Sequence, residues 1–429
     1  MEMITIIIIN NCLIFIFTAV KCNDDHAVLK TMVDLGLSFD CASKAEIQKV
    51  LKFDISPSRI VYANPCKQTS YLKYAASKNV SMMTFDNEDE LHKVKAVYPT
   101  AELIIRILPP ADFKVQCELG CKFGCPPKKA RQLLEAAKKL ELNVVGVSYH
   151  VGSGCEEADA FRVATQQARE VFDIGLELGF NMRLLDIGGG FPGDSQAAIT
   201  FDEIAEVLNL ALDQYFPEDE GVRIIAEPGR FYVSSAFTLA VNIIAKRIVA
   251  RDQDGKERDL AAGLTSNDEP SFMYYVNDGV YGSFNCLLFD HATVYPSLVK
   301  DQDDEMLFSS SVWGPTCDGL DCINKECQLP ELQIGEWIFF KNMGAYTLAA
   351  ASTFNGMPPP KRNYYCLADV WETLYPDFHA KKDNRKKKVL PVKIQSGHNV
   401  TETGSILDDI TGSSPADGLC VGPGFGLDI

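Results

Sequence analysis

Basic residues are scarce in this chain: 41 lysines and arginines stand against 58 aspartates and glutamates, so the formal net charge is −17 at pH 7. This excess of negative charge argues against nucleic acid or an anionic membrane as a partner, because both would repel the protein. It leaves room for a positively charged substrate. Hydrophobic residues make up 46% and charged residues 23% of the 429 residues, which is ordinary for a soluble globular protein. The length predicts two or three domains.

The 14 cysteines lack the regular spacing of a disulfide framework or a zinc site. Cys121 and Cys125 come nearest to a metal-binding pair, but no second cysteine pair or histidine partner follows them. In a chain of this length the pattern favours reduced thiols. We therefore predict no metal site.

The first 20 residues lack the positive charge that normally precedes the apolar part of a secretory signal. Their apolar stretch is also interrupted at Asn10–Asn11, whereas a membrane-spanning helix needs about 20 largely unbroken apolar residues. The alternative is a buried β-strand, FTAVK at 17–21, that ends on Lys21. Cleavage after Ala19 would remove that strand, so the strand is favoured over the signal peptide. A cytoplasmic protein without a membrane partner is expected.

Short apolar runs alternate with helix-like segments over the first half of the chain. Eight runs rich in β-branched residues are predicted strands: 16–21, 38–43, 59–65, 82–86, 102–107, 143–154, 183–191 and 222–230. Between them, segments such as 128–142 and 158–180 carry apolar residues three and four positions apart, as amphipathic helices do. Most of the strand runs are continuously apolar, which is typical of a parallel sheet covered on both faces. Eight such units predict a (β/α)8 barrel, with a doubly wound open sheet as the alternative.

Polar residues gather at the C-terminal ends of these strand runs. They are Lys21, Asp40, Asn64, Asp86, Arg106, His150, Gly188, Gly189, Gly190 and Glu227. In a barrel all these ends converge on one face and build one site, whereas an open sheet gathers only those near its switch point. The distribution therefore favours the barrel.

After Arg230 the helix-like segments of comparable length disappear. Five strand-like runs follow, separated by turn residues: 237–250, 271–279, 309–315, 336–342 and 346–354. They predict an antiparallel, β-sandwich-like domain. We assign residues 1–235 to the barrel and 236–395 to the β domain. Residues 396–429 are rich in Gly, Ser, Asp and Thr with little periodicity, and we predict a disordered tail there.

Three loops at the predicted barrel mouth suit a phosphate group. DIGGGFPG (186–193) places three consecutive glycines after an apolar strand, so backbone N–H groups can approach an anion. HVGSG (150–154) adds a serine-containing turn, and EPGR (227–230) adds Arg230. A plain tight turn is the alternative for the triple-glycine loop taken alone, but three adjacent loops are stronger evidence. Phosphate sites commonly lie at the last strands of a barrel.

A buried lysine beside a phosphate site points to pyridoxal phosphate, which forms a Schiff base with a lysine amine. The pyridine nitrogen of that cofactor needs an acidic partner, which Glu227 can supply, and His150 could stack on the ring. Each residue has a simpler alternative alone: a surface lysine, half of an ion pair, or a hydrogen-bonded core histidine. Their joint placement at one barrel face favours the cofactor site.

Three motifs of the second domain carry polar groups that strand packing does not need: FDHA (289–292), WGPTCDGLD (313–321) and MGAYT (343–347). Cys317 and Asp318 lie between Gly/Pro and Gly, which predicts an exposed turn. A buried structural thiol is the alternative for Cys317, and a turn-capping side chain is the alternative for Asp318.

Together the motifs resemble those of the eukaryotic ornithine decarboxylases, in the alanine-racemase-like group of pyridoxal-phosphate decarboxylases. The resemblance runs from Phe17 to about Tyr375. It rests on AVKCN, FDCASK, YANPCKQ, HVGSGC, LDIGGGFPG, AEPGRF, YVNDGVYGSFNC, WGPTCDGLD and NMGAYT. The chain departs from the family in MEMITIIIINNCLI at its start and in the segment 108–120. It also has Phe289 where the family usually has tyrosine.

The resemblance implies a role for each candidate residue. Lys21 would be the Schiff-base lysine, His150 would stack on the ring, and Cys317 would give a proton to the substrate carbon after carbon dioxide leaves. The implied cofactor-binding residues are Lys21, Asp40, Arg106, His150, Ser153, Gly188, Gly189, Gly190, Glu227, Pro228, Gly229, Arg230 and Tyr346. The implied substrate-binding residues are Phe289, Asp290, Asp318, Tyr281 and Phe354. Asp290 and Asp318 would receive the distal ammonium of ornithine, as two carboxylates suit one cation.

The implied activity is the decarboxylation of L-ornithine to putrescine and carbon dioxide, the first step of polyamine biosynthesis. It implies a homodimer with shared active sites, in which Cys317 and Asp318 come from the other subunit. One alternative is a catalytically inactive relative that binds the regulatory protein antizyme. The segment 69–93 resembles the family's antizyme-binding region, so antizyme is a candidate partner in either case. A related decarboxylase of arginine, lysine or diaminopimelate is a second alternative. The retained cofactor residues favour the enzyme.

Overall fold

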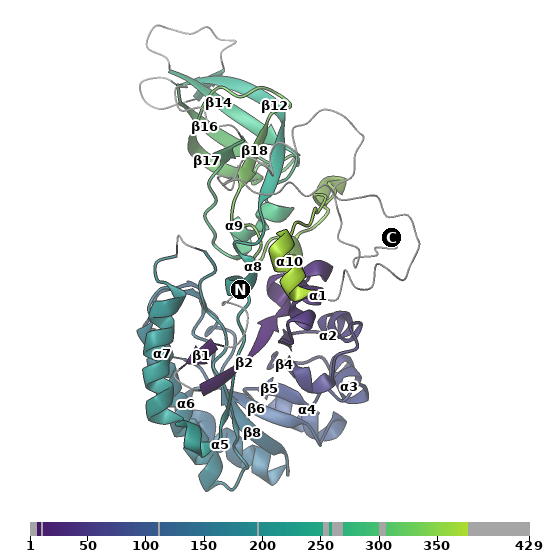
Figure 1. Ribbon diagram of the computed structural model, residues 1–429, viewed down its shortest axis with the longest axis vertical. Helices are drawn as coiled ribbons and strands as arrows, with labels where there is room; N and C mark the ends of the chain where they lie inside the picture. The colour runs from purple at the N-terminus through teal and green to yellow at the C-terminus, as the bar shows by residue number, and fades with distance from the viewer. Residues whose placement is uncertain are drawn as a thin grey trace.

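The computed structural model describes residues 7–9, 12–109, 112–194, 197–251, 257–259, 269–299 and 306–375. It consists of a barrel surrounded by helices and a separate sheet at one end of the barrel (Figure 1). The predicted tail at 396–429 lies outside the described residues. In the described part of the chain, no helix combines the length and the apolar character needed to cross a bilayer.

Eight parallel strands form the barrel. They are β2 (Cys12–Ala19), β3 (Ser38–Cys41), β4 (Ile60–Tyr62), β5 (Met82–Phe85), β6 (Glu102–Arg106), β8 (Asn143–Ser148), β10 (Leu184–Asp186) and β11 (Arg223–Ala226). They follow the order β2-β11-β10-β8-β6-β5-β4-β3, and an additional pairing of β2 with β3 closes the ring. Each strand overlaps one predicted run, so the predicted (β/α)8 barrel is confirmed and the open sheet is excluded.

Helices cover the outside of the barrel in Figure 1. They are α1 (His26–Asp34), α2 (Lys44–Leu51), α3 (Thr69–Ser77), α4 (Glu88–Val97), α5 (Pro127–Lys139), α6 (Asp159–Glu177), α7 (Phe201–Tyr215) and the short α8 (Arg230–Val233). Four of them, α1, α2, α4 and α7, begin with a side-chain N-cap. Thr200, for example, forms a capping box with Glu203 at the start of α7, which satisfies otherwise unpaired backbone N–H groups.

Side chains along most barrel strands alternate between two apolar cores. In β6, Leu103 and Ile105 belong to the large core that includes the helices. Ile104 belongs to a smaller cluster with Phe17 and Ile225. This alternation follows from the two-residue period of a strand. The barrel interior is therefore packed, and its polar groups are left to the strand ends.

The start of the chain adds to the barrel in a way that the sequence did not predict. β1 (Ile7–Ile9) pairs antiparallel with β2, and β2 begins at Cys12, before the predicted start at residue 16. The first half of β2 pairs with β11 through Ile14–Ile16, and the second half pairs with β3 through Phe17–Ala19. The segment that departs from the family, residues 1–14, thus supplies β1 and the first three residues of the strand that leads to Lys21, Cys12–Ile14.

Within the described residues, the second sheet has seven strands: β12 (Leu239–Arg251), β13 (Glu257–Asp259), β14 (Glu269–Val276), β15 (Ser297–Leu298), β16 (Phe308–Trp313), β17 (Cys322–Leu329) and β18 (Trp337–Phe340). All pairings are antiparallel except that of β14 with β16, which is parallel. This confirms a mostly antiparallel second domain. The architecture changes between Ala226 and Leu239, and the exact predicted boundaries at 235 and 395 stay predictions.

The strand predicted at 346–354 is wrong. Two 3-10 turns, η6 (Leu348–Ala350) and η7 (Phe354–Gly356), lie there instead. Tyr346 has a φ of 54° and Asn355 a φ of 55°, and such left-handed backbone cannot continue a strand. The loop before η6 contacts the barrel, because Tyr346 N donates to Cys22 O at 2.9 Å.

The remaining elements lie outside the barrel sheet and the second sheet. The helix α9 (Cys286–Phe289) and the 3-10 turn η5 (Ser283–Asn285) follow β14, and η2 (Pro57–Arg59) and η3 (Glu218–Glu220) lie in barrel loops. A two-stranded ribbon, β7 (Val115–Cys117) and β9 (Ser153–Cys155), lies outside both sheets. The last helix, α10 (Ala368–Leu374), lies beside α1 in Figure 1, and Tyr375 Oη donates to Asp34 Oδ2 there at 2.5 Å.

Candidate active site

Lys21 lies in the 3-10 turn η1 (Val20–Cys22), directly after β2. Its Nζ forms a salt bridge with the fully buried Asp40, at the end of β3. Burial alone would lower the pKa of Lys21, but the carboxylates of Asp40 and Glu227 outweigh it and raise the pKa above its ordinary value. The pairing therefore holds a charged amine at the barrel mouth until a ligand changes its surroundings.

Two buried carboxyl groups lie at the ends of neighbouring strands: Asp186 is the last residue of β10, and Glu227 directly follows β11. Asp186 accepts hydrogen bonds from Gly188 N and Ser148 Oγ, both at 2.9 Å, yet burial raises its pKa to about 6. Burial, together with Asp186 and Asp40, also raises the pKa of Glu227 well above its usual range. In the described structure Glu227 Oε1 is buried without a hydrogen-bond partner, so a donor from a ligand would satisfy it.

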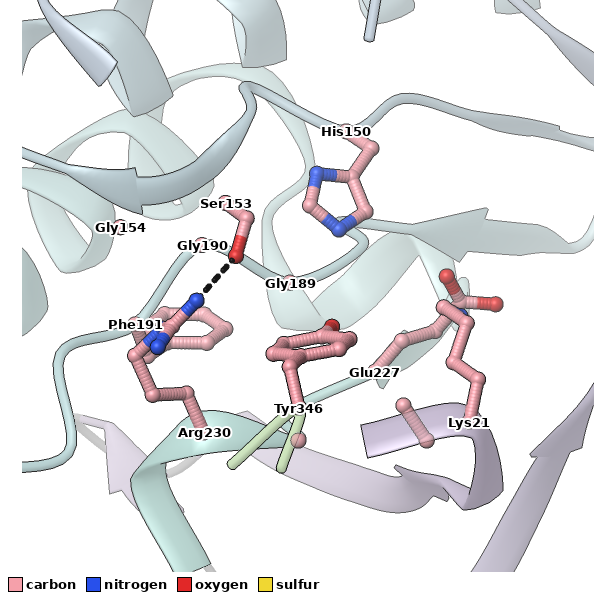
Figure 2. Close-up of a pocket in the computed structure, with 12 residues that line it drawn as sticks. Lys21, His150, Ser153, Gly154, Gly189, Gly190, Phe191, Glu227, Arg230 and Tyr346 are labelled. Atoms are coloured by element: carbon pink, nitrogen blue, oxygen red, sulfur yellow. Dashed lines mark hydrogen bonds between the residues drawn. The ribbon is translucent and has the colours of Figure 1, made fainter. Parts of the chain in front are cut away.

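His150 faces the same space from the end of β8. Its Nδ1 accepts from Gly152 N at 3.2 Å, so in the neutral ring Nε2 carries the proton. Burial, and then the charges of Arg106 and Lys21, lower its pKa well below the ordinary value. A Cβ on Gly189 would lie 3.0 Å from His150 Nε2 and 2.7 Å from Glu227 O, so only glycine leaves this space open. Figure 2 shows the imidazole across the pocket from the ring of Tyr346.

The opposite end of the pocket has the features of an anion site. Arg230 Nη2 donates to Ser153 Oγ at 3.0 Å (Figure 2), and the guanidinium lies 5.1 Å from the ring centroid of Tyr346. Gly190 has a φ of 110°, and a Cβ there would lie 2.6 Å from Gly152 O. A cation, a hydroxyl and an open glycine backbone are the groups that bind phosphate.

Most predicted cofactor residues line one pocket: Lys21, His150, Ser153, Gly189, Gly190, Glu227, Gly229, Arg230 and Tyr346. The other predicted residues support its walls. Asp40 lies behind Lys21, and Arg106 is close enough to lower the pKa of both His150 and Glu227. Pro228 O accepts from Ala19 N at 3.2 Å, and Gly188 N binds Asp186. The amine, the unpartnered carboxyl oxygen and the phosphate cradle fit the chemistry of pyridoxal phosphate.

Several residues predicted to bind substrate form a second group in the β domain. Tyr281 Oη donates to Asp318, the rings of Tyr281 and Phe354 lie 4.4 Å apart, and Cys317 N donates to Asn355 Oδ1 at 3.0 Å. Cys317 is exposed, as its predicted turn requires. Within the described chain, none of this group lines the Lys21 pocket. Phe289 is 70% exposed.

The turn that carries Cys317 is held by Asp321, which the candidate list did not include. Asp321 Oδ1 accepts from Val280 N at 2.8 Å, and Oδ2 accepts from Thr316 N at 2.9 Å and Thr316 Oγ1 at 2.6 Å. Its signal in the sequence is its place as the last residue of WGPTCDGLD. Asp186 was missed in the same way, although it opens DIGGGFPG.

Asp290 lies beside Arg230, whereas Asp318 accepts a hydrogen bond from Tyr281. The buried Oδ1 of Asp290 lies 2.7 Å from Arg230 Nη2, and its Oδ2 accepts from Gln116 Nε2 at 3.1 Å. Cys117 Sγ also donates to Asp290 O at 3.5 Å. Gln116 and Cys117 belong to the segment that diverges from the family, and no motif pointed to them.

The chain matches known proteins over most of its length. Residues 9–234 match the family model described as pyridoxal-dependent decarboxylase, pyridoxal binding domain. An ornithine decarboxylase of Mus pahari is 56% identical over 359 residues, covering 83% of this chain and 77% of the relative. An antizyme inhibitor 2 of Homo sapiens is 44% identical over 410 residues, covering 95% of this chain and 85% of the relative.

Solved structures of decarboxylases also align with this chain. The agmatine-bound arginine decarboxylase of Paramecium bursaria Chlorella virus aligns with a TM-score of 0.72 and 36% identity, covering 81% of this chain and 88% of that one. The putrescine-bound lysine/ornithine decarboxylase of Vibrio vulnificus aligns with a TM-score of 0.69 and 30% identity, covering 81% and 86%. The chain therefore belongs to the family of pyridoxal-dependent decarboxylases.

Proposed function

We propose that this protein decarboxylates L-ornithine to putrescine and carbon dioxide with pyridoxal 5′-phosphate as its cofactor. One observation carries the cofactor and the reaction: a single pocket holds the amine of Lys21, the unpartnered buried oxygen of Glu227 and the Arg230–Ser153 cradle. Ornithine as the substrate is supported by the relatives named ornithine decarboxylase. Pyridoxal phosphate, when bound, would be held through Lys21 and would supply an electron sink for the decarboxylation of an amino acid whose amine takes the place of the lysine amine.

The chain's own residues orient and stabilise this chemistry. Glu227 Oε1 would accept a hydrogen bond from the protonated ring nitrogen, because this oxygen is buried and lacks a partner within the described residues. The neutral imidazole of His150 would pack on the ring. Ser153, Gly190, Gly229, Arg230 and Tyr346 would surround the phosphate. Asp40 would accept the proton that the Lys21 ammonium releases, which leaves both groups neutral, since it already pairs with that amine.

The distal ammonium of ornithine would bind carboxylates of the β domain, Asp318 and Asp290, and the exposed Cys317 would return a proton to the substrate carbon. Tyr281, Phe354 and Phe289 would line this end. The Cys317 group does not line the Lys21 pocket of its own described chain, which supports a homodimer in which Cys317 and Asp318 serve the partner's pocket. The domain bounds 1–235 and 236–395, and a cytoplasmic location, are part of the same proposal.

A catalytically inactive, antizyme-binding relative is the second candidate. Two relatives support it by name, antizyme inhibitor 2 of Xenopus laevis at 53% identity and that of Homo sapiens at 44%. The predicted antizyme-binding segment 69–93 spans α3 and most of α4. Against this candidate stands the pocket itself, because a protein that only binds antizyme has no use for Lys21, Glu227 and Arg230 in one place.

The test is to measure carbon dioxide released from carboxyl-labelled ornithine, lysine and arginine by the full chain with pyridoxal phosphate. The proposal predicts release from ornithine in preference to the two longer amino acids, and loss of putrescine formation in Cys317→Ala. No release from any of them, with antizyme still bound, would establish the inactive relative. If carbon dioxide is released preferentially from lysine or arginine, that amino acid is the substrate and the assignment of ornithine is wrong.

A further inference from the structure

The ribbon β7–β9 brings a glutamine of the divergent segment to the phosphate end of the pocket. Val115 pairs with Cys155 and Cys117 with Ser153, so Gln116 lies opposite Gly154. A Cβ on Gly154 would lie 2.7 Å from Gln116 Oε1 and 2.8 Å from Gln116 Cβ, and the residue has a φ of 62°. Only glycine at 154 leaves room for the Gln116 side chain in this position.

Gln116 holds Asp290 by two hydrogen bonds from one amide group. Its Nε2 donates to Asp290 O at 2.5 Å and to Asp290 Oδ2 at 3.1 Å. Asp290 is 4% exposed, so its carboxylate has little access to water and depends on protein donors. The two bonds fix both the main chain and the side chain of the residue that follows α9.

Asp290 in turn holds Arg230. Gln116 occupies Oδ2 of the carboxylate, which leaves Oδ1 facing Arg230 Nη2 at 2.7 Å. The same Nη2 donates to Ser153 Oγ at 3.0 Å. The guanidinium is therefore fixed from two sides, by a hydroxyl of the barrel and by a carboxylate of the β domain, with its plane over Tyr346.

We propose that Gln116 is a positioning residue that acts through Asp290 to orient Arg230 toward the phosphate cradle. An arginine side chain has many rotamers, and a fixed carboxylate removes most of them before the phosphate arrives. The same contact presets Asp290, so Gln116 links the phosphate end of the pocket to a carboxylate proposed to receive the ammonium of ornithine. The inference rests on the proposed function for the cofactor and the substrate.

The test compares pyridoxal phosphate with unphosphorylated pyridoxal as ligands of the full chain freed of cofactor, followed by absorbance. The variants are Gln116→Ala and the isosteric Gln116→Glu, which removes the donor and places a second carboxylate beside Asp290. Gln132→Glu, the same change on the exposed face of α5, is the matched control. Circular dichroism and the urea midpoint establish that each variant is folded.

We expect both Gln116 variants to bind pyridoxal phosphate about tenfold more weakly, the size of one weakened hydrogen bond to a charged group, and to bind pyridoxal as the wild type does. KM for ornithine should rise more than kcat falls, because Asp290 is displaced before the chemical step. A purely structural role would weaken both ligands equally, and that result overturns the inference, as does an unchanged preference for the phosphate. If the wild type itself shows no preference for the phosphorylated ligand, the proposed cofactor site fails instead.

Discussion

Replacing Asp186 by asparagine should stabilise the cofactor-free protein at neutral pH. Asp186 is fully buried, and burial raises its pKa to about 6 from an ordinary 3.8. One pKa unit corresponds to about 1.4 kcal/mol. Above pH 6, ionisation of Asp186 therefore lowers the free energy of unfolding by about 3 kcal/mol. Asparagine has the same shape and keeps an oxygen for Gly188 N and an amide group for Ser148 Oγ, so we expect a net gain of about 1–3 kcal/mol.

The sign of the pH dependence follows from the raised pKa. Between about pH 4 and pH 6 the folded protein holds the Asp186 proton and the unfolded chain does not, so wild-type stability from this group falls as pH rises. Above pH 6 both states are ionised and the loss is complete. The free energy of unfolding of Asp186→Asn should therefore exceed that of the wild type by an amount that grows from pH 4.5 to pH 6.5 and then stays constant.

Urea denaturation of the cofactor-free full chain at pH 4.5, 5.5, 6.5 and 7.5 measures this difference directly. Saturating pyridoxal phosphate should reduce the difference in the free energy of unfolding, since a cationic nitrogen beside Glu227 would favour the ionised forms of Glu227 and Asp186. A variant that is less stable than the wild type at pH 7.5, or a difference that does not change with pH, would refute the reasoning that burial of the charge dominates at Asp186.

Two further predictions concern residues outside the pocket. Asp25 Oδ2 accepts hydrogen bonds from Arg362 Nη1 at 2.6 Å and from Tyr364 Oη at 2.9 Å. Asp25→Asn should therefore lower the free energy of unfolding by about 1–2 kcal/mol. An unchanged urea midpoint would contradict a stabilising role for these contacts with Arg362 and Tyr364. Asp321→Asn removes a hydrogen-bond acceptor from the turn that carries Cys317. It should lower kcat about tenfold and leave the affinity for pyridoxal phosphate unchanged. A tenfold loss of that affinity as well would contradict a role confined to the turn.

The barrel and its lining could be predicted because both depend on short stretches of sequence. Each strand run carries its own apolar pattern, and the polar residue that closes it, such as Lys21, Asp40 or Glu227, lies at a fixed place in that pattern. Since the C-terminal ends of parallel barrel strands meet on one face, local sequence is enough to bring these residues together.

The contacts that were missed join parts of the chain that local patterns do not relate. Gln116 and Asp290 are 174 positions apart, and nothing in either stretch marks them as neighbours. The parallel pairing of β14 with β16 likewise depends on how the chain returns to the sheet. The apolar run at 346–354 looks like a strand, but the contact of Tyr346 with Cys22 fixes a left-handed backbone that ends any strand there.

The central claim is that Lys21 carries the cofactor. The most direct measurement is the visible absorption spectrum of the full chain with pyridoxal phosphate, for the wild type, for Lys21→Ala and for Lys49→Ala, a lysine on α2 whose side chain is 44% exposed. We predict a band of covalently bound cofactor in the wild type and in Lys49→Ala, and no band in Lys21→Ala. A band of wild-type intensity in Lys21→Ala would contradict the account.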